Sequence, residues 1–117
     1  MARYDEKTAD GIVEKLLAEH PDNFACLFEA AQYHAKKCDW RKAIELYELS
    51  FEKETRRPRF QDELMAIRDI YEILGDYPNA ARTCGRIMEL LRGEWGITEG
   101  DELKALQDEK ARLEAMG

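Results

Sequence analysis

The feature that most constrains this chain is an amphipathic stretch near its middle whose pattern recurs on both sides. Between Asp39 and Phe51, apolar side chains fall on one face of a helix, and charged side chains occupy the opposite face. The stretch is therefore predicted to be a helix with one buried side and one solvated side. Its buried side is expected to carry Trp40, Ala43, Ile44, Tyr47, Ser50 and Phe51.

The same signals return at nearly constant distances along the chain. Ala43 lies 34 residues after Ala9 and 37 residues before Ala80. A period of this length, built from helix–turn–helix units, is typical of a helical repeat array. We therefore predict that the three alanines occupy equivalent positions in stacked helices.

The residues at these positions resemble the tetratricopeptide repeat (TPR) family. Ala43, Tyr47, Ser50 and Phe51 match the consensus of its second helix. Leu74-Gly75-Asp76-Tyr77, followed by Ala80, is similar to the turn between its two helices, and His20-Pro21-Asp22-Asn23 to its terminating proline segment. The resemblance covers roughly residues 8 to 92 and implies an all-α fold, a tetratricopeptide-like right-handed α-α superhelix of about six helices.

The resemblance also implies boundaries within one domain that spans residues 1–117. A half repeat at 6–19 precedes full repeats at 24–57 and 60–93, and a capping helix follows at 101–115. The half repeat lacks its first helix, so its apolar stripe is expected to be covered on one side only. Either the chain comes from a longer solenoid or another subunit docks there, which makes homo-oligomerisation through the half repeat possible. The stripe consists of Ile12, Val13, Leu16 and Leu17.

Three local features of the loops follow from this register. Asp39 is expected to cap the central helix. Cys38 stands where the family has a turn glycine, so the register predicts a backbone near the left-handed region there. Trp95 and Ile97 are expected to be pinned beneath the capping helix.

Composition excludes several classes of protein. With 44% hydrophobic residues the chain is not predicted to be disordered, and no apolar run reaches the length of a membrane span. A net charge of −7 disfavours direct nucleic-acid binding, which needs clustered Lys and Arg. Three cysteines without a spaced framework favour free thiols in a cytoplasmic protein.

The sequence predicts no enzyme, cofactor or metal site. His34 and Cys38 lie four residues apart, but a structural role for His34 is favoured over zinc binding. Ser50 lies on the buried stripe without a glycine elbow, which disfavours serine nucleophile chemistry. The basic run at 53–59 is interpreted as a solvated linker, with a site for an acidic ligand or phosphate as the alternative.

The predicted function is a non-enzymatic scaffold that binds a peptide segment of a partner protein. The resemblance implies that the first helices of successive hairpins line a concave groove. Phe28, Met65 and Ile73 would form an apolar strip edged by acidic side chains, which suits a basic amphipathic partner; alternatively, the capping helix or a neighbouring subunit covers them. The predicted peptide-binding residues are Phe28, Gln32, Lys36, Asp62, Met65, Asp69, Glu72 and Ile73.

Two other functions remain open. The segments at 90–97 and 102–106 are similar to the tail of helical-repeat domains in large bacterial transcriptional regulators. In that case the chain is an oligomerisation or signal-input fragment, although no DNA-reading helix is present in it. A purely structural, self-associating protein is the third possibility. The lysine and asparagine clamp of the chaperone-binding members of the family is absent, so a chaperone tail is not expected.

Overall fold

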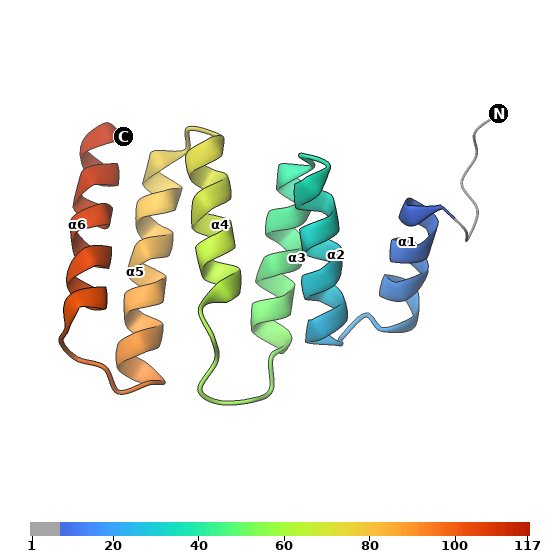
Figure 1. The fold of residues 1–117 in the computed structure, drawn as a ribbon, viewed down its shortest axis with the longest axis horizontal. Coiled ribbons are helices and arrows are strands. Elements are labelled where there is room, and N and C mark those ends of the chain that lie inside the picture. The colour runs from blue at the N-terminus through green and yellow to red at the C-terminus, as the bar shows by residue number, and fades with distance from the viewer. Residues whose placement is uncertain (1–7) are drawn as a thin grey trace. The chain divides into compact units, whose positions relative to one another are not determined.

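The computed structural model describes residues 8–117, and this part of the chain contains six helices and no strand (Figure 1). The predicted all-α class is confirmed. The helices group into two compact units, of which unit 1 ends at Glu54 and unit 2 is Thr55–Gly117. The helices are α1 (Ala9–Glu19), α2 (Phe24–Lys36), α3 (Trp40–Lys53), α4 (Asp62–Ile73), α5 (Tyr77–Gly93) and α6 (Asp101–Met116).

Unit 1 is centred on the hairpin of α2 and α3. Small residues on α2 allow α3 to approach closely, because Ala30, Ala31 and Ala43 are all completely buried. Ser50 of α3 donates its hydroxyl to the carbonyl of Phe24 at 2.9 Å, which satisfies this buried polar group. Ala43, Tyr47 and Ser50 of the predicted stripe are buried, and Leu46 is buried although the prediction did not include it.

The first helix, α1, contains no buried residue and packs against α2. Tyr33 of α2 donates its hydroxyl to Asp10, and Lys37 pairs with the same carboxylate at 2.7 Å. Val13, Leu16 and Leu17 are half-buried, whereas Ile12 is 54% exposed. The apolar stripe of α1 is thus covered only in part, as the sequence predicted.

The predicted equivalence of the three alanines is correct for two of them. Ala43 and Ala80 are both completely buried near the start of the second helix of a hairpin. Ala9 is exposed. Ala43 packs beneath the preceding helix α2, and Ala80 beneath the preceding helix α4. Ala9 has no such cover, because in the described part of the chain no helix precedes α1.

The turns inside the two hairpins have the same backbone geometry. Cys38 has φ 61° and Gly75 has φ 74°, so both lie in the left-handed region, as predicted for Cys38. After Cys38, the Asp39 amide donates to the carbonyl of His34 at 2.9 Å, and after Gly75 the Asp76 amide donates to that of Tyr71 at 2.8 Å. Both helices therefore end in a Schellman-type turn.

The two aspartates that follow these turns differ in the partner of their side chain. Asp76 accepts the amide of Asn79 at 3.3 Å and caps α5. Asp39 makes no capping hydrogen bond to α3, contrary to the sequence prediction. Its carboxylate faces His34 Nδ1 at 3.2 Å instead, so the ring competes successfully for the same oxygen atoms.

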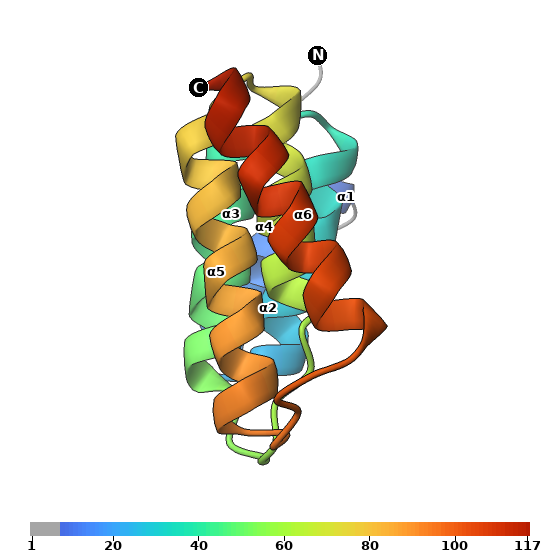
Figure 2. The ribbon, with the colours of Figure 1, turned by 90° about the vertical axis from the view of Figure 1, so that its left-hand side faces the viewer.

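In unit 2, α5 is the central helix and packs against both α4 and α6. Figure 2 shows α6 in front, crossing α5 at a shallow angle. Ala80, Ala81 and Cys84 of α5 form a cluster with Leu113 of α6, and Leu113 is completely buried. The apolar stripe of α6 consists of Leu103, Leu106 and Leu113, all buried, as the sequence pattern predicts.

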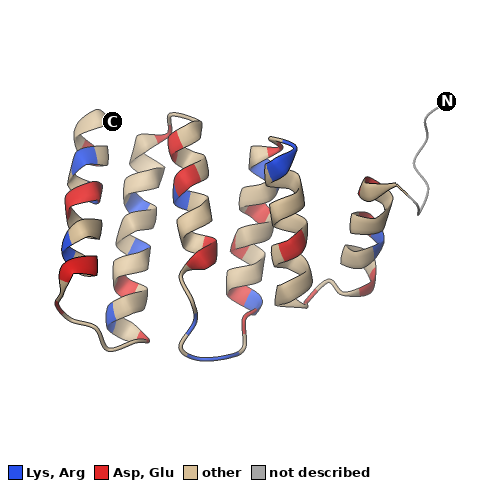
Figure 3. Ribbon diagram, viewed as in Figure 1, with Lys and Arg blue, Asp and Glu red and all other residues tan. Residues whose placement is uncertain are grey.

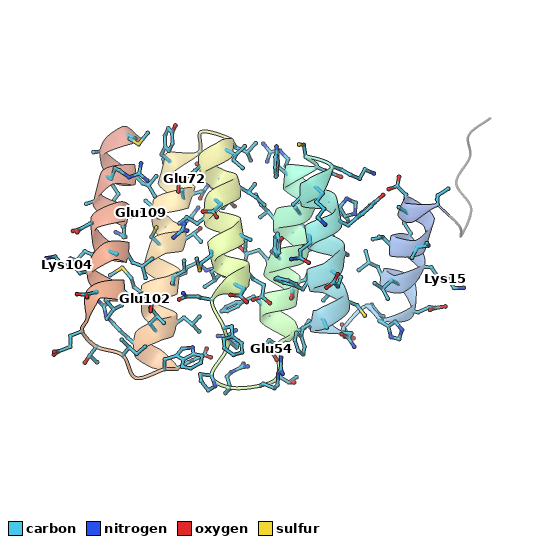
Figure 4. All side chains as sticks on the ribbon, viewed as in Figure 1. Lys15, Glu54, Glu72, Glu102, Lys104 and Glu109 are labelled. Carbon is cyan, nitrogen blue, oxygen red and sulfur yellow. The ribbon has the colours of Figure 1, made fainter. Side chains whose placement is uncertain are left out.

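A row of three polar pairs joins α4 to α6 and shows that the two helices run in the same direction. Gln61 bonds to Glu102 at 2.8 Å, Arg68 pairs with Glu109 at 3.1 Å, and Glu72 pairs with Arg112 at 3.4 Å. Figure 4 labels the three glutamates, which follow one another along unit 2. In every pair the α6 residue lies 40 or 41 residues after its α4 partner. We call this set the α4–α6 polar row.

Two arginines of the basic segment before α4 share one carboxylate of unit 2. Figure 3 shows this segment as a blue loop. The Arg59 amide and its Nε each donate to the Glu94 carboxylate at 2.9 Å, and Arg57 Nε lies 3.9 Å from it. These bonds to Arg59 lower the pKa of Glu94. The arrangement agrees with the predicted linker, and it ties Arg59 to the end of α5.

Candidate functional site

The three predicted binding residues of unit 1 lie along one face of α2, at intervals of one helical turn. Phe28 is half-buried and its ring meets that of Tyr47 edge-on, with 5.6 Å between centroids. Gln32 is half-buried and Lys36 is exposed in the last turn. Phe28 is therefore partly used for packing within the hairpin, which leaves Gln32 and Lys36 as the more accessible members of this face.

The other five predicted residues lie on α4 in unit 2, and their exposure differs. Ile73 is 60% exposed, Asp62 and Asp69 are exposed, and Met65 is half-buried. An exposed isoleucine one helical turn from the exposed carboxylate of Asp69 is a feature of interaction surfaces rather than of cores.

The two carboxylates predicted to edge the apolar strip have partners inside unit 2. Glu72 belongs to the α4–α6 polar row through Arg112. Asp69 accepts from Arg68 at 3.1 Å but keeps a side chain that is 60% exposed. Asp69 is thus the more accessible acidic group of the pair.

A cavity that the sequence did not predict lies at the N-terminal ends of α4 and α6. Its volume is about 300 Å³. Apolar side chains form part of its lining. Phe60 is 60% exposed and Trp95 is 38% exposed, whereas Leu91 is buried. We call it the Phe60–Trp95 pocket; it is lined by Phe60, Gln61, Asp62, Leu91, Trp95, Ile97 and Glu102.

Local contacts hold the aromatic wall of this pocket in place. The Trp95 indole N–H donates to the carbonyl of Arg59 at 2.6 Å. The rings of Phe60 and Trp95 lie 5.6 Å apart between centroids, at an interplanar angle of 47°. Because Arg59 is itself bound to Glu94, the loop before α4 and the end of α5 fix each other and hold both rings.

Trp95 and Ile97 were expected beneath α6, and the exposure of Trp95 corrects this expectation for the tryptophan. Both line the Phe60–Trp95 pocket, and Trp95 keeps more than a third of its surface exposed. The indole turns toward Arg59 because a carbonyl acceptor is available there. Phe60 was missed altogether, although its aromatic ring directly before the apolar stripe of the fourth helix, and outside that stripe, is a signal in the sequence.

The groups that could support catalysis or bind a metal have structural partners. His34 Nδ1 faces Asp39, and across residues 8–117 no three His, Cys, Asp or Glu side chains converge as metal ligands do. Cys84 is buried and donates its thiol to Glu109 at 3.6 Å. Burial, with the Glu109 carboxylate, raises the pKa of Cys84 to about 11, so this thiol is a poor nucleophile at neutral pH.

Comparison of the chain with protein-family models, with curated proteins and with solved structures finds no match. Within the described residues, no helix has the length and apolar character needed to cross a bilayer.

Proposed function

We propose that this chain is a tetratricopeptide-like scaffold that binds a peptide segment of a partner protein and catalyses no reaction. The observation that carries the proposal is the repeated turn. Cys38 and Gly75, 37 residues apart, share a left-handed backbone and the same pattern of amide-to-carbonyl hydrogen bonds. Hairpins that repeat in this way are characteristic of solenoid proteins, which bind partners through extended surfaces.

The α4–α6 polar row adds a second, independent argument. It aligns α6 with α4 at an offset of 40 or 41 residues, so α6 takes the place that the first helix of a further hairpin would take. The polar outer side of α6 suits a capping helix. Together these features favour a half repeat, two full repeats and a cap.

The proposed binding residues are the faces of α2 and α4 described above. Exposed Asp69, one turn before exposed Ile73, and exposed Asp62 at the start of the same helix suit a segment that is both basic and amphipathic. The proposed partner is a cytoplasmic protein, and no cofactor, membrane or nucleic acid is required.

The test uses capture of partners from a lysate of the source cell by immobilised protein. Asp69→Lys combined with Ile73→Ser removes one charge and one apolar contact from the α4 face. The variant should lose proteins that the wild type retains, and the loss should be greatest at low salt. The matched control is Glu89→Lys, because Glu89 is exposed on the second helix of the same hairpin. Retention of the same proteins by all three chains would contradict the proposal.

Self-association is the second candidate, and the exposure of Ile12 on α1 favours it. It would fit an oligomerisation or signal-input fragment of a bacterial regulator. Light scattering distinguishes the two functions, since a self-associating chain changes its mass with concentration and Ile12→Glu shifts it to the monomer. A wild type that stays monomeric at high concentration excludes this candidate.

A further inference from the structure

The Phe60–Trp95 pocket combines an apolar wall with groups that accept hydrogen bonds. Phe60, Trp95 and Ile97 provide the apolar surface, and Asp62 and Glu102 bring two carboxylates from the first turns of α4 and α6. A ligand that fits this lining has a flat or apolar body and a positively charged donor.

Gln61 fixes one of these two carboxylates. Its amide nitrogen donates to Glu102 at 2.8 Å, which fixes the orientation of the amide, because the reversed group would bring two acceptors together. The amide oxygen is then buried, and it finds no donor among the residues that the structure describes. Gln61 therefore holds the Glu102 carboxylate in place, while its own amide oxygen has almost no surface open to solvent.

The charge of the pocket is not balanced by the residues that line it. The lining includes no Lys, Arg or His. The nearest basic residue in sequence, Arg59, binds Glu94 through its amide and its guanidinium. Asp62 and Glu102 therefore give the lining two carboxylates, and no cation is among the lining residues.

We propose that the Phe60–Trp95 pocket binds an arginine side chain of a partner protein. The planar guanidinium stacks on aromatic rings and carries five N–H donors, enough for Asp62 and Glu102 together. Its three methylene groups match the apolar wall. The cavity of about 300 Å³ is large enough for one such side chain with part of its backbone. The inference depends on this pocket alone and does not require that the α2 and α4 faces bind a peptide.

The test is an NMR titration of the whole chain with the peptide acetyl-Ala-Leu-Arg-Leu-Ala-amide. The two indole N–H signals act as probe and internal reference, because Trp95 lines the pocket and Trp40 lies in unit 1. We expect saturable shifts of Trp95 and Phe60 and a constant Trp40 signal. The same peptide with citrulline keeps the shape of arginine without its charge, and it should bind roughly tenfold more weakly. A lysine peptide should lie between the two, since its ammonium cannot stack in the same way.

Substitutions in the pocket test the assignment of each group. Asp62→Asn and Glu102→Gln should each weaken binding of the arginine peptide roughly threefold to tenfold, and Phe60→Ala by a similar factor. The matched controls Asp108→Asn and Glu99→Gln remove exposed charges outside the pocket and should leave the affinity unchanged.

Two results would overturn this assignment. Equal affinity for the arginine and citrulline peptides would show an apolar pocket that does not select charge. Shifts confined to α2 and to Asp69 and Ile73 of α4, with Trp95 unmoved, would favour the peptide scaffold but not the arginine pocket. Failure of the scaffold proposal alone would instead leave the Trp95 response intact.

Discussion

Cys38 holds a backbone conformation in which a side chain is a disadvantage. At φ 61° its Cβ is crowded, whereas Gly75 meets no such penalty at φ 74° in the matching turn. We predict that Cys38→Gly is neutral or stabilises the fold by up to about 1 kcal/mol, because lost strain offsets the greater entropy of the unfolded chain. Urea denaturation followed by circular dichroism measures the change.

The reciprocal substitution is the control for this prediction. Gly75→Ala should destabilise by about 1–2 kcal/mol through strain alone, since a Cβ at this position meets no atom within 4 Å. A clear loss of stability in Cys38→Gly would show that the thiol makes a contribution that outweighs the strain.

Cys84 should be the least reactive of the three thiols. It is buried with its pKa raised to about 11, so at pH 8 almost no thiolate is present, whereas Cys38 is exposed. Brief treatment with iodoacetamide at pH 8, read by mass spectrometry, should label Cys38 and spare Cys84. In 6 M guanidinium all three should be labelled, which serves as the control; equal labelling in the native protein would contradict the burial of Cys84.

At this scale the sequence predicted the backbone better than the side-chain partners. The left-handed turn at Cys38 followed from its alignment with Gly75, because backbone geometry depends on position in the hairpin. The side-chain partner of Asp39 could not be predicted in the same way. The free energies of a helix-capping hydrogen bond and of a hydrogen bond to His34 differ by only about 1 kcal/mol. Ala9 was placed incorrectly, because burial depends on the neighbouring helix and not on the residue type.

The packing of α6 against α5 depends on a small number of buried side chains. Leu113 is completely buried against Ala80, Ala81 and Cys84, so Leu113→Ala should cost about 2–4 kcal/mol. Met116, which is 50% exposed on the same helix, provides the control, and Met116→Ala should cost less than about 1 kcal/mol. Urea denaturation measures both, and similar losses would mean that α6 does not pack as described.

The link between the loop before α4 and the end of α5 should depend on pH. The bonds from Arg59 lower the pKa of Glu94. The stabilisation that ionised Glu94 gives the folded protein is therefore complete above about pH 4.5, its pKa in the unfolded chain, and is lost as the pH falls through the lowered pKa of the folded state. At pH 7, Glu94→Gln should reduce stability by at most about 1 kcal/mol. The difference from the wild type should narrow below pH 4.5. Glu99→Gln, the control, should show no such difference at any pH.

Helices were predictable from the sequence, and the pocket was not. The periodicity of apolar residues sets the position and the buried side of each helix, as Leu103, Leu106 and Leu113 illustrate. The Phe60–Trp95 pocket combines side chains from the loop before α4, the end of α5 and the start of α6. No local pattern relates three such segments, because their meeting depends on the packing of the whole unit.

Unit 2 has its own core, and this leads to a prediction about the whole molecule. A chain of residues 55–117 should fold alone, because its core comes from its own three helices. At roughly 60 residues it buries only about 60% of its unfolded surface, so its stability should be a few kcal/mol. A cooperative urea transition in circular dichroism would support this expectation. The same fragment with Leu113→Ala is the control and should be largely unfolded.

The α4–α6 polar row makes the stability of unit 2 depend on salt concentration. One flank of α6 is held by leucines and the other by ionic pairs, and dissolved salt strengthens the first while it weakens the second. Ionic strength therefore acts on the two flanks in opposite directions. Concentrated electrolyte should therefore weaken the ion pairs of Glu109 and Glu72, while the buried leucines keep α6 packed on α5.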